Sequence, residues 1–206
     1  KEGQNEIYYA TGATFEEVLK SPYLEAFKDK DIEVLVFLDE IDDFVFTGFE
    51  FKGKRLKSVS KGDINLDKAE EDEKKDTQKK YKKLLDLVKD ILKDDVKDVR
   101  FSGRLTDSVC CLVAEEGDMD PQMEKLLKAM GQDVPQRKRV LEINPSHPLF
   151  AAMNTIFEND KNSPHLEDYT RLLYDQALLL EGSKPKDPAA FAKVLARLMV
   201  ENAEKY

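Results

Sequence analysis

HLEDYTRLLYDQALLLE (165–181) and PAAFAKVLARLMVENA (188–203) are the two stretches that decide the fold. In each, apolar residues recur at the spacing of one helical face, which predicts two helices joined by a short loop. Near the end of the first helix, and around much of the second, apolar residues cover more than one face. Packing two helices together hides about one face of each, so apolar surface is left over.

That surplus must be covered, either by the preceding part of the chain or by another chain. Coverage by the preceding part is the alternative that the pattern alone leaves open. We expect instead a four-helix bundle formed by two copies across a two-fold axis. The residues expected at this dimer interface are Leu172, Leu173, Leu178, Leu179, Phe191, Val194, Leu195, Leu198 and Met199.

The composition indicates a globular protein that does not bind nucleic acid. Of 206 residues, 36% are charged and 41% hydrophobic, and the net charge is -9. Nucleic-acid binders usually carry a basic surface, so the negative charge argues against one. No apolar run approaches the ~18 residues of a membrane span. The start, KEGQNEIYYA, has neither an initiator Met nor a signal peptide, so we expect a piece of a longer chain.

Residues 1–66 alternate between strand and helix patterns. A strand at 7–10, a helix from Phe15 and an apolar strand at 33–38 form a βαβ unit, followed by a short helix or turn at 41–49 and a strand at 55–60. We therefore expect part of an α/β domain in residues 1–66.

A highly charged stretch, residues 67–83, marks the expected boundary, and a helix with an apolar face continues from it to Leu92. Strand patterns follow at 96–105, 108–114 and 139–143, with a turn at 106–107. We expect residues 67–206 to form a second domain, with a three-stranded sheet, its helices and the terminal helix pair. The predicted fold class is α+β.

A methionine-rich helix is expected at 118–131, which we call the methionine arm. Met119, Met123, Leu126, Leu127 and Met130 fall on one face of it. Methionine side chains are flexible and common on surfaces that accept varied partners. The alternative is that this face packs on the chain's own sheet.

Catalysis is not expected. The acidic residues Asp39, Glu40, Asp42 and Asp43 have no partnering base nearby, and His147 more often caps or lines a turn than acts as a base. Cys110 and Cys111 are neighbours on a strand and point to opposite faces, so we expect buried thiols in a reducing compartment and no metal site.

Four stretches in this order resemble the C-terminal domain of the ninety-kilodalton heat-shock protein (Hsp90) chaperone family. They are VKDVRFSGRLTDSVCCLV (96–113), MDPQMEKLLKAMGQ (119–132), KRVLEINPSHPL (138–149) and YDQALLLEG (174–182). Residues 7–49 are similar to the end of that family's middle domain. The ending ENAEKY lacks the MEEVD tail of the eukaryotic cytosolic branch, which favours the bacterial HtpG-like branch.

The resemblance implies a cytoplasmic homodimer that binds unfolded clients and assists protein folding under heat stress. It places ATP and magnesium in an N-terminal domain, so we expect no cofactor and no independent enzyme activity here. The client-binding residues it implies are Phe44, Met119, Met123, Leu126, Leu127 and Met130. A purely architectural dimerisation module without client contact is the alternative function.

Overall fold

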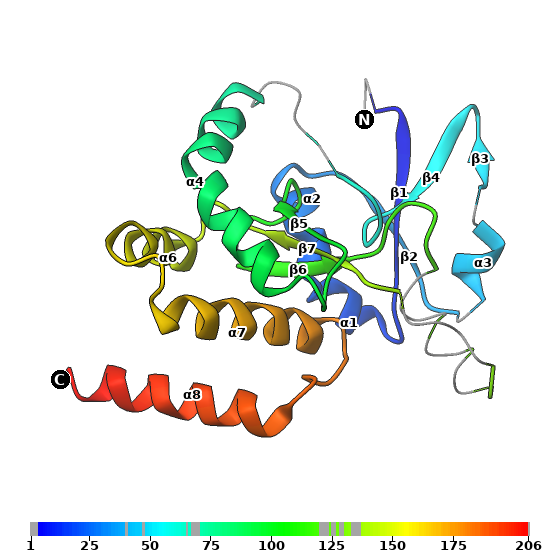
Figure 1. Ribbon diagram of the computed structural model, residues 1–206. Helices are drawn as coiled ribbons and strands as arrows, with labels where there is room; N and C mark the ends of the chain where they lie inside the picture. Colours follow the sequence, from blue (N-terminus) through cyan, green and yellow to red (C-terminus); the bar gives the residue numbers. More distant parts are fainter. Residues whose placement is uncertain are drawn as a thin grey trace.

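The computed structural model describes residues 4–39, 41–46, 48–64, 66, 71–119, 124, 127, 130–132 and 137–205, with the backbone alone at 43, 44, 71–75 and 78. Two small sheets and their helices make up the fold, which confirms the α+β class (Figure 1). Within the described residues, none of the helices is long and apolar enough to cross a bilayer.

The first sheet contains β1 (Glu6–Thr11), β2 (Val34–Phe37), β3 (Glu50–Phe51) and β4 (Lys54–Ser58), in the order β2-β1-β4-β3. Strand β1 lies parallel to β2 and to β4, and β3 is antiparallel to β4. The β1–β2 connection holds α1 (Phe15–Leu19), the 3-10 helix η1 (Pro22–Leu24) and α2 (Glu25–Asp29), and α3 (Asp42–Phe46) follows β2. The expected βαβ unit is therefore confirmed.

The two faces of this sheet are covered differently. Tyr8 and Ala10 of β1 belong to a core that includes Val18 of α1 and Phe27 of α2. Residues alternate between faces along a strand, so Tyr9 points the other way. Its ring lies 5.4 Å from that of Phe37, which in turn stacks on Phe46 of α3 at 4.4 Å.

The second sheet contains β5 (Asp98–Phe101), β6 (Cys110–Val113) and β7 (Val140–Ile143), in the order β5-β7-β6. Strand β7 is parallel to β5 and antiparallel to β6. The strands are shorter than predicted, and the turn at 106–107 does not join two paired strands, because β7 lies between them.

Helices α4 (Glu71–Ile91), α6 (Pro148–Asn159) and α7 (Pro164–Leu180) cover one face of the second sheet with the main core (Figure 1). Helix α6 was not among the predicted elements. It begins with Pro148 in the first turn, and His147 Nδ1 accepts a hydrogen bond from the Leu149 amide, so the expected capping role of His147 is confirmed.

The opposite faces expected for Cys110 and Cys111 are also confirmed. Cys110 belongs to the main core and Cys111 to a smaller cluster with Leu105 and Val113 on the other face. Both thiols are free and buried. Burial raises the pKa of Cys110 to about 12, and that of Cys111 well above its ordinary value, so both remain protonated at neutral pH.

Helix α8 (Pro188–Ala203) packs along α7 on the outside of the molecule (Figure 1). Asp187 caps its first turn by accepting hydrogen bonds from the amides of Ala189 and Ala190. An ion pair joins Arg197 of α8 to Asp168 of α7. None of the residues of α8 is buried. The predicted helix pair is therefore present, whereas the bundle with a second copy stays a prediction.

Candidate functional site

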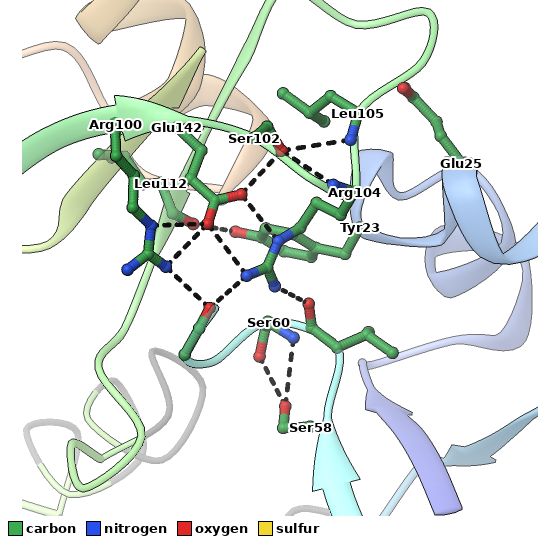
Figure 2. A network of polar contacts seen from close by, with 12 residues as sticks. Tyr23, Glu25, Ser58, Ser60, Arg100, Ser102, Arg104, Leu105, Leu112 and Glu142 are labelled. Carbon is green, nitrogen blue, oxygen red and sulfur yellow. Dashed lines mark hydrogen bonds and ion pairs between the residues drawn. The ribbon is translucent and has the colours of Figure 1, made fainter. Parts of the chain in front are cut away.

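A fully buried carboxylate, Glu142 of β7, joins the second sheet to the first part of the chain. Oε1 accepts hydrogen bonds from Arg100 Nη2 at 2.8 Å and Arg104 Nη2 at 3.1 Å. Oε2 accepts one from Arg104 Nε and one from Ser102 Oγ, both at 2.8 Å. Every lone pair is thus used, which offsets the cost of burying the charge (Figure 2).

Arg104 also reaches across to the first part of the chain. It is 0% exposed, and its Nη1 and Nη2 donate to the carbonyls of Val59 and Gly62, just after β4. Lys61 forms a parallel bridge with Ala114. These residues precede the expected boundary at 66/67, so the last residues of the first unit are already bonded to the second sheet.

Two side chains from the β1–β2 connection strengthen this junction. The Tyr23 hydroxyl donates to the Leu112 carbonyl at 2.5 Å. The Glu25 carboxylate accepts hydrogen bonds from the amides of Thr106 and Asp107 at 2.9 Å. Burial alone would raise the pKa of Glu25, but the hydrogen bonds it receives outweigh burial and leave that pKa below its ordinary value.

The largest uncovered apolar surface of the terminal helices lies on α8 and the end of α7. Leu179 and Leu180 of α7 are 48% and 47% exposed, and Met199 of α8 is 65% exposed. Leu195 and Val200 are exposed as well. We call these five residues the tail surface. Monomeric proteins rarely leave large apolar patches in water.

The predicted dimer-interface residues divide into three groups. Leu179, Leu195 and Met199 are exposed, and Leu172, Phe191, Val194 and Leu198 are half-buried. Leu173 and Leu178 lie in the main core of the chain, at 1% and 8% exposure, because that face of α7 packs on β6. These two therefore have almost no surface left for another chain.

The predicted client-binding residues are only partly described. Met119 and Met130 are exposed and Leu127 is half-buried. Met123, Leu126 and the side chain of Phe44 lie outside the described residues. Midway along the methionine arm, Glu124 is buried and accepts a hydrogen bond from Arg139 Nη2 at 2.6 Å.

A second apolar surface, which sequence reasoning missed, lies on the first sheet and α3. We call it the α3 surface; its exposed residues are Leu35, Leu38, Ile41, Val45, Phe49 and Phe51. The Phe46 ring connects it to the sheet, with Phe37 on one side and Phe49 on the other. The signal that could have found it is the density of aromatic residues in 44–51.

Of the acidic residues considered for catalysis, Asp42 begins α3 and Asp39 lies just before it. The Asp39 amide donates to the Asp42 carboxylate at 3.1 Å, a local bond that shapes the turn. Glu40 lies outside the described residues, as does the side chain of Asp43. The described part of the site therefore offers two apolar surfaces and a rigid polar junction, an arrangement suited to binding other polypeptides.

Comparison with known proteins gives a consistent match. The family described as "Hsp90 protein" matches residues 1–205. The chain is 48% identical, over 98% of its length, to the chaperone protein HtpG of Geobacter metallireducens, and 45% identical, over 95% of its length, to that of Mycobacterium avium. It spans 32% and 31% of these two relatives, about a third of each.

Replacing the buried carboxylate tests the junction. Glu142→Gln leaves the buried charge of Arg104 without its counter-ion, so we expect the free energy of unfolding to fall by about 3 kcal/mol. Urea denaturation measures it. Glu16→Gln, which removes a similar charge from an exposed pair with Lys20, is the control and should barely change stability. Equal effects of the two variants would contradict this role of Glu142.

Acid titration tests the contribution of Glu25. Because its pKa is lower in the folded chain than in the unfolded one, Glu25 stabilises the fold fully above the unfolded value of about 4.5 and loses this contribution as the pH falls further. Denaturation at several pH values should therefore show a shallower loss of stability below pH about 5 for Glu25→Gln than for the unaltered chain. Parallel pH profiles of stability for the two proteins would contradict this contribution of Glu25.

Proposed function

The chain belongs to the Hsp90 family, and on this premise we propose that it is the dimerisation and client-binding part of an ATP-dependent chaperone that assists protein folding. The observation that carries the proposal is helix α8, which has a wide apolar stripe and no buried residue. A helix of this kind gains most of its stability from packing. A second copy that presents the same pair of helices would cover the part of the α8 apolar stripe that α7 leaves exposed.

The dimer interface we propose centres on the tail surface. Leu179, Leu195 and Met199 are its exposed members, and the half-buried Leu172, Phe191, Val194 and Leu198 continue the same stripes. Leu173 and Leu178 are left out, because the chain's own core already covers them. Two antiparallel helix pairs related by a two-fold axis would form the four-helix bundle.

Client binding is proposed for the methionine arm and the α3 surface. Exposed Met119 and Met130 offer flexible apolar contacts, and Val45 and Phe49 offer stiffer ones on the other unit. Phe44, Met123, Leu126 and Leu127 are included on the basis of the sequence resemblance. Unfolded chains expose apolar side chains, so separate patches held by a rigid junction suit them as partners.

The whole protein's activity is likewise a proposal. The chain spans about a third of its relatives, and we propose that ATP and magnesium bind in another part of a longer cytoplasmic protein. Nucleotide-driven closure there would change how the client-binding patches of the two copies face each other, and the polar junction would carry that movement to α7.

A purely architectural dimeriser is the second candidate. It is favoured by the buried Glu124–Arg139 ion pair, which holds the middle of the methionine arm against the start of β7. An arm held in this way could present its methionines to the chain itself and leave nothing for clients.

Charge substitution on α8 tests dimerisation. Leu195→Glu with Met199→Glu places two carboxylates in the proposed interface, and we expect the dimer dissociation constant to rise at least about 30-fold. Sedimentation velocity over a concentration series measures it. Lys193→Glu changes the net charge equally on the side of α8 opposite Leu195 and Met199, and should raise the dissociation constant far less. A chain that is monomeric at high micromolar concentration would refute the proposal.

A single substitution on the methionine arm separates the two candidates. Met130→Glu removes an exposed apolar contact, so binding of a permanently unfolded model protein should weaken about tenfold if clients bind here. Fluorescence anisotropy measures the affinity, and Gln132→Glu supplies the same charge at an exposed polar position nearby. If both variants bind as the unaltered chain does, the architectural role is favoured.

A further inference from the structure

A basic cleft lies where the start of β7, the end of α7 and the segment after α4 meet. Its volume is about 310 Å³. Five basic side chains line it, namely Arg137, Lys138, Arg139, Lys184 and Lys186. Four acidic ones do so as well: Asp94, Asp95, Glu124 and Glu181. The lining therefore carries one positive charge in excess, in a chain whose net charge is -9.

Three of the four acidic residues in the cleft take part in ion pairs, and two basic residues, Lys186 and Arg139, serve as their partners. Asp95 Oδ1 lies 2.5 Å from Lys186 Nζ. Glu124 and Glu181 both face Arg139, at 2.6 Å and 3.7 Å. Among the described residues, Lys184 has no ion-pair partner, and it is exposed at the cleft. A further anion would therefore meet a positive charge that is not yet compensated.

The decisive observation concerns one nitrogen of Arg139. The residue is only 9% exposed; its Nη2 donates a hydrogen bond to Glu124 at 2.6 Å, whereas its Nε lies 3.7 Å from Glu181 Oε2, too far for a hydrogen bond. Its Nη1 is buried and has no hydrogen-bond partner in the described part of the chain. A buried N–H without an acceptor is costly, so native proteins rarely keep one without a water, an ion or a ligand beside it.

Tyr174 adds a second donor to the same cleft. Its side chain is largely buried and lines the cavity. Burial, together with the nearby carboxylates Asp95, Glu181 and Asp175, raises the pKa of Tyr174 to about 12. The phenol therefore keeps its proton at neutral pH and can donate a hydrogen bond to an acceptor in the cleft.

We propose that this cleft binds a small oxyanion, a phosphate or carboxylate group, with Arg139 Nη1 as its buried donor and Lys184 as its exposed counter-charge. Guanidinium groups bind both kinds of oxyanion through charge-assisted hydrogen bonds. The volume suits the anionic group together with a few further atoms. The bound anion and Glu124 would contact the same Arg139 guanidinium. Binding of the anion would therefore stabilise the position of Glu124 within the methionine arm.

Titration of the 206-residue chain followed by amide NMR tests this site. The probes are inorganic phosphate and, separately, acetate, at ionic strength held constant with sodium chloride. We expect saturable shifts at the amides of Ser183 and Lys184, and the tighter of the two probes identifies the kind of group that the site accepts. Absence of saturable shifts there with both probes would overturn the proposal.

Two variants and a control locate the contacts. Lys184→Ala, at an exposed position, should weaken binding of the tighter probe about fivefold, whereas Lys193→Ala on α8 removes the same charge far from the cleft lining and should not. Arg139→Lys keeps the charge facing Glu124 but loses the Nη1 donor, and should weaken binding more than tenfold where circular dichroism confirms folding. Equal loss in the two lysine variants would mean non-specific attraction and would overturn the site.

Discussion

The burial of one negative charge, on Glu142, constrains the rest of the structure. A carboxylate that is taken out of water is tolerated only if its oxygens are fully paired. Two arginines and a serine meet this requirement, and Arg104 then has donors left over, which bond to carbonyls beyond β4. The hydrogen bonds that satisfy this one charge therefore also link the second sheet to the first part of the chain (Figure 2).

The other face of the same sheet positions the terminal helices. Glu142 points toward the first unit, and its neighbours Leu141 and Ile143 point into the core beneath α4, α6 and α7. On β6, the Cys110 thiol lies 3.1 Å from the Leu173 carbonyl of α7. A displacement of the first unit would thus be transmitted through a single thin sheet to α7, and from α7 to the exposed α8.

The predictability of each feature depends on how far apart its determining residues lie in the sequence. The βαβ unit and the two terminal helices follow from local periodicity, so they were predicted well. Helix α6 was not predicted because its cap, His147, lies between Pro145 and Pro148. Proline is typical of strand ends and loops as well as of the first turn of a helix. The Glu142 junction joins residues about 40 positions apart, and the burial of Leu173 depends on β6, so neither leaves a local signal. The strand order of the second sheet leaves no local signal either, since β7 pairs between strands that precede it by many residues.

The apolar surfaces and the polar junction follow from opposite requirements. A surface proposed to accept varied partners must avoid specific hydrogen bonds, and the exposed, flexible side chains of Met119 and Met130 suit that proposed role. The polar junction that holds such surfaces in place needs directional hydrogen bonds of defined geometry, and the buried arginines supply them. Arg139 stands between the two, because it pairs with Glu124 of the arm and with Glu181 at the end of α7. The anion proposed to bind at Arg139 Nη1 would therefore share one guanidinium with the arm and with the end of α7.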